Sequence, residues 1–185
     1  IQMAKKIALN SAYGAIGNQY FRYFDVRQAE AITLGGQLSI RWVENDVNKF
    51  MNKVLQTTNK NYVVASDTDS IYVEMGDLVD KVCKDKSIQQ ITNFLNKVSE
   101  DKIQSVIDDS FKRLAEYINA YDQKMIMKRE IIANKGIWVA KKRYILNLFD
   151  EEGVRYSEPK LKVMGVEAIK SSTPEVCRGK IKEAI

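Results

Sequence analysis

The chain contains no histidine, and its only cysteines are Cys83 and Cys177. Structural zinc sites and catalytic dyads that depend on histidine are therefore excluded. Two widely separated cysteines favour a reducing compartment. A metal bound by this chain must be held by oxygen ligands from Asp or Glu, and Mg²⁺ and Mn²⁺ are the ions that prefer such ligands.

Long apolar runs are also absent. The longest, residues 62–65 and 137–140, are far shorter than the roughly 20 residues that a transmembrane helix needs. The 185 residues are 45% hydrophobic, which is enough for one sizeable core, so we expect a globular chain without a membrane span. The net charge of +5 is compatible with nucleic-acid binding but does not require it. Because the chain stops within helix-like sequence, we expect it to be cut from a longer protein.

Helical spacing of apolar residues predicts most of the chain's regular structure. Helices are predicted over residues 1–16, 27–55 and 88–118. The first is followed by a bend, and the second is one long amphipathic helix whose apolar pattern only Gly35 and Gly36 interrupt. Pro174 is predicted to open a last helix, with Thr173 as its cap.

Two segments have the composition of β-strands. Residues 62–73 are β-branched and aromatic on both sides of a polar turn, which predicts a β-hairpin. Residues 125–164 are predicted to form strands separated by turns at 134–136 and 150–153. The elements together predict an α+β fold in which an antiparallel sheet packs on helices.

One polar stripe lies on the first predicted helix. Lys6, Asn10, Tyr13 and Gly14 stand at i, i+4, i+7 and i+8 and therefore share one helix face. Lysine can meet a phosphate, asparagine can donate to a phosphate oxygen, tyrosine can pack on a sugar or base, and glycine leaves room beside them. The stripe favours a nucleotide-facing surface, and the alternative is a solvated face with Tyr13 capping the core.

Two carboxylates, Asp67 and Asp69, flank Thr68 at the tip of the predicted hairpin. Anions held this close repel each other, and a divalent cation relieves the repulsion. A pair of such cations can activate an attacking hydroxyl and stabilise a leaving pyrophosphate. The alternative is an ordinary turn in which aspartate bonds nearby backbone amides. Glu130 is either a buried acidic neighbour of this metal site or, as we favour, an ion-pair partner of adjacent cations.

The most basic segment consists of Lys141, Lys142, Arg143 and Tyr144, followed further along by Lys160 and Lys162. In the middle of a strand, Lys142 and Tyr144 would share one face, opposite the face of Lys141. One face would then present a cation and an aromatic ring to a nucleic-acid backbone. The alternative is a solvated edge strand that its lysines protect from aggregation.

In chain order, Lys6-x-x-x-Asn10-Ser11-Ala12-Tyr13-Gly14, Asp67-Thr68-Asp69-Ser70 and Lys141-Lys142-Arg143-Tyr144 resemble three motifs of the B-family DNA polymerases. These are the K-x-x-x-N-S-x-Y-G fingers motif, the D-T-D-S palm hairpin and the K-K-R-Y element. Residues 31–33 and 158–174 are similar to the replicative polymerases of large tailed bacteriophages, which implies a viral origin and a place in the host cytoplasm. One departure is Ala65-Ser66, where the family usually has an aromatic residue and glycine.

The resemblance implies template-directed DNA synthesis, with deoxynucleotidyl transfer to a primer 3′-hydroxyl and two Mg²⁺ or Mn²⁺ ions. Asp67 and Asp69 would be catalytic and would hold metal, Asp69 being the better ligand. The nucleotide-binding residues that it implies are Lys6, Asn10, Tyr13 and Gly14, and the DNA-binding residues are Lys141, Lys142, Arg143, Tyr144, Lys160 and Lys162. Its partners would be primer-template DNA, deoxynucleoside triphosphates and, through regions absent here, a sliding clamp.

The resemblance also implies a division into domains: 1–18 as the C-terminal part of the fingers, 19–165 as the larger part of the palm and 166–185 as the start of the thumb. The family's other aspartate-bearing strand has no match here, so we expect this chain alone not to extend a primer. Two alternatives remain: a non-catalytic nucleic-acid-binding module with the same fold, whose DNA binding would be sensitive to salt and independent of metal, and a generic metal-dependent nucleotidyltransferase.

Overall fold

The computed structural model describes residues 2–184, and its architecture is α+β as the sequence predicts. In chain order the elements are α1 (Gln2–Ile16), α2 (Val26–Leu55), β1 (Val63–Asp67), β2 (Ser70–Val73), α3 (Gly76–Val82), α4 (Ile88–Val98), a π-helical turn (Ser99–Ile103), α5 (Gln104–Tyr117), β3 (Ile131–Ala140), β4 (Arg143–Glu151), β5 (Val154–Met164) and α6 (Glu175–Ala184). The strands form two antiparallel sheets, β1–β2 and β3–β4–β5.

Helix α2 is the longest helix of the helical layer. It begins after Asp25, whose side chain accepts a hydrogen bond from the Arg27 N–H, and it ends at Gln56, which has a left-handed φ of 55°. Gly35 and Gly36, which interrupt its apolar pattern, lie inside the continuous helix, so the long helix predicted over residues 27–55 is confirmed. A buried stripe of α2 packs against α5, and the shared core contains Val43, Val47, Met51, Leu55, Tyr62, Val63, Ile103, Ile107 and Phe111.

The helix predicted over residues 88–118 is confirmed as α4, the π-helical turn and α5 in direct succession. It begins with a capping box, in which the Gln90 N–H donates to the Ser87 side chain and the Ser87 N–H donates to the Gln90 side chain. The apolar face of α5 closes the core against α2, as its amphipathic pattern predicts.

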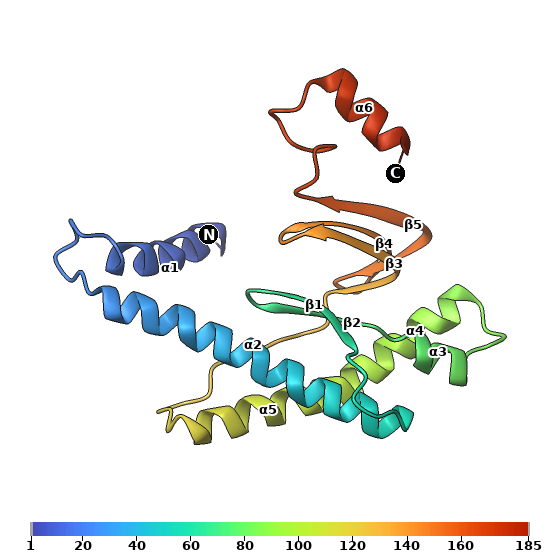
Figure 1. Cartoon of the computed structure of the whole chain (residues 1–185), viewed down its shortest axis with the longest axis horizontal. Helices are drawn as coiled ribbons and strands as arrows, with labels where there is room; N and C mark the ends of the chain where they lie inside the picture. Colours follow the sequence, from blue (N-terminus) through green and yellow to red (C-terminus); the bar gives the residue numbers. More distant parts are fainter. Residues whose placement is uncertain (1, 185) are drawn as a thin grey trace.

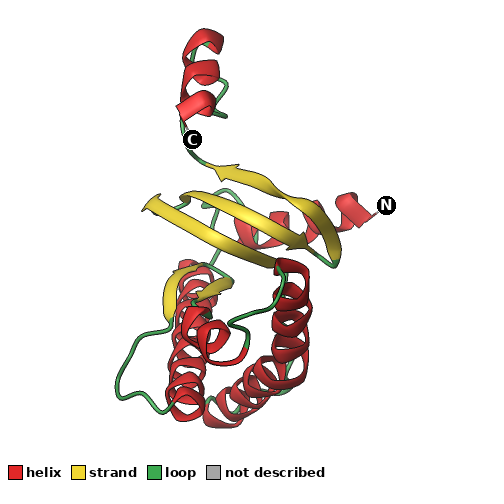
Figure 2. Cartoon of the chain, turned by 90° about the vertical axis from the view of Figure 1, so that its right-hand side faces the viewer, coloured by secondary structure: helices red, strands yellow, loops and turns green. Residues whose placement is uncertain are grey.

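The hairpin β1–β2 lies between this helical layer and the three-stranded sheet, as Figures 1 and 2 show. Ala65 pairs with Tyr72 and Asp67 pairs with Ser70. Ile71 and Val73 of β2 pack against the helical core. The hairpin predicted over residues 62–73 is therefore confirmed, with one of its faces on the helices.

The three-stranded sheet corrects one part of the sequence prediction. The turn predicted at 134–136 is wrong, because β3 runs without interruption from Ile131 to Ala140. The chain reverses instead at Lys141 and Lys142, and Lys142 takes a left-handed φ of 61°. Residues 122–130 have no regular secondary structure, so the first predicted strand is wrong up to residue 130, and only Ile131 and Ile132 of it belong to β3. The turn predicted at 150–153 is confirmed.

The last helix begins one residue later than predicted. The Arg178 N–H donates to the Pro174 carbonyl oxygen at 3.0 Å, so Pro174 rather than Thr173 occupies the cap position of α6. Cys83 is buried and Cys177 is exposed, and both thiols are free. Among residues 2–184, none of the helices is long and apolar enough to cross a membrane.

Candidate active site and nucleic-acid interface

Asp67 and Asp69 lie at a very tight turn. The Asp69 N–H donates to the Asp67 carbonyl oxygen at 2.6 Å, and Thr68 between them has a φ of 51°. A left-handed conformation is uncommon for a β-branched residue and is held here by the flanking strands. Asp67 is half-buried and accepts a hydrogen bond from the Thr68 hydroxyl at 3.0 Å, whereas Asp69 is exposed. The turn therefore presents two carboxylates close together, one of them free to meet a ligand.

The pairing of the two strands determines which way Asp67 faces. Side chains of directly paired residues share a face, and faces alternate along a strand. Asp67 and Ser70 therefore lie on the same face as the next pair, Ala65 and Tyr72. Since Ile71 occupies the opposite face against the helical core, the face with Asp67 is turned away from the helices.

The aspartates fit a hard divalent cation in chemistry but do not complete its ligand set. Their oxygens suit Mg²⁺ or Mn²⁺. Within residues 2–184, no group of three or more acidic, histidine or cysteine side chains could hold a metal. Glu130 is not part of any such group, so it does not complete the set. It is exposed rather than buried, and no ion pair includes it in this part of the chain. Its neighbour Arg129 pairs instead with Asp150.

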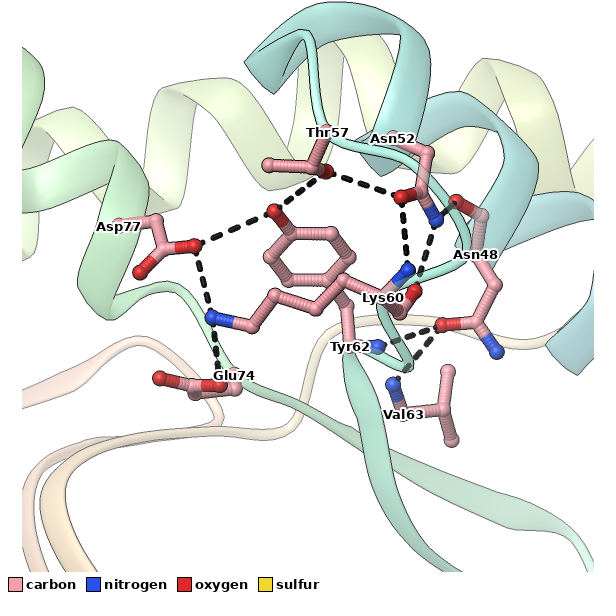
Figure 3. Close-up of polar contacts among 8 residues, drawn as sticks. All are labelled: Asn48, Asn52, Thr57, Lys60, Tyr62, Val63, Glu74 and Asp77. Carbon is pink, nitrogen blue, oxygen red and sulfur yellow. Dashed lines mark hydrogen bonds and ion pairs between the residues drawn. The ribbon is translucent and has the colours of Figure 1, made fainter.

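The base of the hairpin is fixed to the end of α2 by backbone hydrogen bonds to asparagine side chains (Figure 3). The Asn48 Oδ1 accepts from the Tyr62 N–H at 2.7 Å and from the Val63 N–H at 3.0 Å. The Asn52 amide donates to the Lys60 carbonyl at 2.7 Å and accepts from the Lys60 N–H at 3.0 Å. Both asparagines therefore determine where β1 starts.

A second set of contacts closes around the ring of Tyr62, which is fully buried (Figure 3). Its hydroxyl lies 2.9 Å from the Thr57 hydroxyl and donates to Asp77 Oδ2 at 3.2 Å. The Lys60 ammonium lies 2.7 Å from the same Asp77 oxygen and 3.6 Å from Glu74. The hydrogen bond from Lys60 is the main reason why the pKa of Asp77 is lowered. Hydrogen bonds with Asn48, Asn52 and Asp77 thus hold the base of the hairpin that carries the two aspartates.

Three aromatic rings join the hairpin to the three-stranded sheet. The ring of Tyr72 lies 5.1 Å from that of Trp138, at an interplanar angle of 68°, and 5.7 Å from that of Tyr144, at 60°. Trp138 and Tyr144 are directly paired across β3 and β4. Burial and, next, a hydrogen bond with Tyr144 raise the pKa of Tyr72. The structure thereby brings the aspartate hairpin and the basic segment together.

The basic segment forms a turn rather than the middle of a strand. Lys141 and Lys142 are the exposed turn residues between β3 and β4, so the predicted sharing of faces within this segment is wrong. Gly165 lies against this turn, since a Cβ added to it would stand 2.1 Å from the Lys142 carbonyl oxygen. The Arg143 guanidinium pairs with Glu167. Two lysines are left projecting at the end of the sheet.

Lys160 and Lys162 lie on β5 and share one acidic partner. The Glu151 carboxylate lies 3.0 Å from the Lys160 ammonium and 2.7 Å from that of Lys162. Hydrogen bonds from Lys162 and then Lys160 lower the pKa of Glu151 to about 2. The Tyr156 hydroxyl also accepts from Lys160, at 3.2 Å. Both lysines are therefore paired within the protein, but the single carboxylate offsets only one of their two positive charges.

The predicted stripe on α1 is formed as expected. Lys6, Asn10, Tyr13 and Gly14 are all exposed on this helix, whose eight-residue step from Lys6 to Gly14 spans roughly 12 Å. Figure 1 shows the tip of the β1–β2 hairpin pointing toward the side of the molecule that carries α1. Within residues 2–184, however, no hydrogen bond or ring contact links the stripe to the hairpin. The structure thus confirms the common helix face and the exposure, but not a shared site.

Sequence reasoning missed several residues that position these groups. They are Asn48, Tyr72, Gly136, Trp138 and Glu151. One of them carried a usable signal: Tyr72 stands two residues after Ser70 on a strand, so alternation alone places it on the face of Asp67. Asn48, Trp138 and Glu151 depend on partners in other elements, and Gly136 leaves room for Trp138 of its own strand and for Leu146 of β4.

Comparison with known proteins agrees with these observations. Residues 1–112 match the family described as DNA polymerase family B. The chain is 44% identical over 194 residues to the DNA-directed DNA polymerase of Escherichia phage RB69 and 40% identical to that of Enterobacteria phage T4. Each match covers the whole chain but only 22% of the relative's length. On the strength of this family match and of its three motifs, the chain belongs to DNA polymerase family B.

Proposed function

We propose that this chain supplies most of the palm of a longer template-directed DNA polymerase. Residues 1–18 would end the fingers, 19–165 form the larger part of the palm and 166–185 begin the thumb. The observation that carries the proposal is the pair Asp67 and Asp69 at the tip of a hairpin that is hydrogen-bonded at its base and joined to a lysine-bearing turn through Tyr72. Rigid support of this kind is what a metal-dependent site needs.

The reaction is deoxynucleotidyl transfer to a primer 3′-hydroxyl. The 3′-hydroxyl gives up its proton to solvent water, its oxygen forms a bond to the α-phosphorus of the incoming nucleotide, and the bond from that phosphorus to the leaving pyrophosphate breaks. Asp67 and Asp69 would hold two Mg²⁺ ions together with a carboxylate from another segment. Bound there, the ions supply activation of the attacking hydroxyl and stabilise charge on the pyrophosphate. Exposed Asp69 can offer more of its oxygens to the ions than half-buried Asp67.

The other candidate residues bind substrates in this proposal. On α1, Lys6 and Asn10 would contact the triphosphate, and Tyr13 would pack at the nascent base pair beside Gly14. The turn residues Lys141 and Lys142, with Arg143 and Tyr144, would contact the duplex near the primer end. Lys160 and Lys162 would contact the duplex further along once phosphate replaces Glu151 as their partner.

The test is Asp69→Ala in the longer polypeptide, assayed for extension of a labelled primer. We expect extension to be abolished while the dissociation constant for primer-template DNA stays nearly unchanged, because the substitution removes a metal ligand and no cation. Asp85→Ala, at another exposed aspartate, is the matched control and should extend normally. Retained extension by the Asp69 variant would sink the assignment.

A non-catalytic nucleic-acid-binding module is the second candidate. It is favoured by one observation, that Asp67 already accepts a hydrogen bond from Thr68 within its own turn. It predicts DNA binding without any dependence on divalent metal. Titration of the longer wild-type polypeptide with Mg²⁺ distinguishes the two candidates. A polymerase incorporates nucleotides only when Mg²⁺ is added, whereas a binding module incorporates none at any Mg²⁺ concentration.

A further inference from the structure

We propose that Tyr72 is a positioning residue that fixes the distance between the aspartate hairpin (β1–β2) and the basic turn (residues 141–144). The inference rests on the proposed polymerase function. In it, the ring of Tyr72 determines where a metal held by Asp67 and Asp69 lies relative to DNA held by the basic turn. Tyr72 itself touches neither metal nor DNA in this role.

The first step of the argument concerns how the two sheets are connected. The hairpin β1–β2 and the sheet β3–β4–β5 share no strand pairing, and the two views place one directly over the other. Backbone hydrogen bonds therefore do not set their separation, and side chains must. At the end of the sheet next to the basic turn, Tyr72 contacts both Trp138 and Tyr144.

The second step concerns how movement of the ring would reach the carboxylates. Tyr72 pairs with Ala65, and the next pair on the same face is Asp67 with Ser70. Two residues of strand span roughly 7 Å. The strand pairing between these positions couples a displacement of Tyr72 to Asp67. The charge of Asp67 is also among the causes that raise the pKa of Tyr72, after burial and the contact with Tyr144. Tyr72 is thus near the metal ligands and rigidly connected to them.

The third step concerns the other side of the contact. A Cβ added at Gly136 would stand 2.7 Å from both Trp138 Cη2 and Leu146 Cδ2. The six-membered ring of the Trp138 indole therefore occupies the space beside a strand position that has no side chain. Tyr144 is paired with this tryptophan, and the residues just before it in the chain are Arg143 and the two turn lysines. The indole of Trp138, which contacts Tyr72, is therefore itself held in place beside the basic turn.

The consequence is a defined geometry between two functional groups that come from different sheets. An edge-to-face contact fixes both the separation and the angle of the rings more closely than aliphatic packing does. Misplacement of reacting atoms by about 1 Å can cost roughly 10²-fold in rate. Replacing the ring with a flexible aliphatic side chain should therefore reduce turnover without removing any ligand of metal or DNA.

The experiment compares Tyr72→Leu, which keeps apolar bulk but loses the flat ring, with Tyr72→Phe, which keeps the ring. Fe²⁺ replaces Mg²⁺ in the longer polypeptide bound to saturating labelled primer-template, and ascorbate with peroxide then generates hydroxyl radicals at the metal. The positions of DNA cleavage report where the metal lies along the primer. We expect focused cleavage at the primer end for wild type and Tyr72→Phe, and weaker, spread cleavage for Tyr72→Leu with a roughly 10²-fold lower kcat.

The matched control is Tyr121→Leu, which makes the same change at a fully exposed tyrosine and should keep the wild-type pattern. If Tyr72→Leu does not fold, Trp138→Leu removes the partner ring from the other sheet and should spread the cleavage in the same way. A focused pattern in the folded ring-removing variants would overturn the positioning role while leaving the polymerase function intact. Absence of local cleavage and of extension in the wild type would instead refute the proposed function itself.

Discussion

The three-stranded sheet is attached to the rest of the molecule at two ends that rely on different interactions. At one end Asp150 is fully buried and pairs with Arg129 and, at 2.8 Å, with Arg155, while Arg129 also donates to Asn96 of α4. At the other end the attachment is the ring contact of Tyr72 with Trp138. One attachment depends on buried opposite charges, and the other depends on the separation and angle of packed rings. The candidate active site lies at the aromatic end.

The largest expected loss of unfolding free energy comes from removing the buried carboxylate of Asp150. Asp150→Ala leaves two arginines facing each other without a counter-charge, and removing one partner of a buried ion pair typically costs about 3–5 kcal/mol. Urea unfolding followed by circular dichroism measures the loss of unfolding free energy. Asp109→Ala removes an exposed aspartate that pairs with Arg113 and should cost less than about 1 kcal/mol. Equal losses in the two variants would contradict the difference between buried and exposed pairs.

A smaller effect is expected from disturbing the aromatic end. Gly136→Ala places a methyl group 2.7 Å from the indole of Trp138, so the ring must move, and overpacking of this kind costs about 1–3 kcal/mol. The near-ultraviolet circular dichroism of tryptophan should change as well. Gly35→Ala is the control, because a Cβ there meets nothing within 4 Å and alanine in a helix should stabilise by about 0.5–1 kcal/mol. If Gly136→Ala changed neither the unfolding free energy nor the near-ultraviolet circular dichroism, the Trp138 ring would not be packed against position 136.

Gly136 also shows where reading the sequence failed. A glycine next to asparagine and lysine is typical of a turn, and the turn was predicted there. The structure uses this glycine for space instead, under the ring of Trp138, and makes the turn from Lys141 and Lys142. Local composition does not distinguish these uses, because the side chain that needs the space is recognised only after the strands have paired.

The parts that the sequence did predict depend on short-range patterns. The helix α2, the hairpin and the common face of Lys6 and Asn10 follow from periodicity within one element. The contact of Tyr72 with Trp138 joins residues that lie 66 positions apart in the chain. The ion pair of Lys160 with Glu151 depends on the register of two strands. Candidate residues were therefore predicted one by one, while their spatial relationships required the structure.

The smallest expected effect is a change in melting temperature when Glu151, a partly exposed charge at the same end of the sheet as buried Asp150, is replaced. Glu151 follows Asp150 directly, but its side chain is partly exposed, and its two lysines lower its pKa to about 2 from an ordinary value of 4.5. A lowered folded-state pKa contributes stability above pH 4.5 that is lost as the pH falls from about 4.5 to about 2. The melting temperature of Glu151→Gln should therefore lie slightly below wild type at pH 7, and the difference should vanish near pH 2.

The control is Glu152→Gln, which removes the same charge from the exposed neighbour. Since no lysine pairs with Glu152 among residues 2–184, its melting temperature should follow wild type at both pH values. A difference between Glu151→Gln and wild type that persists at pH 2 would mean that the carboxyl contributes through packing rather than charge. In that case the charge contribution to stability at this end of the sheet would come from Asp150 and not from Glu151.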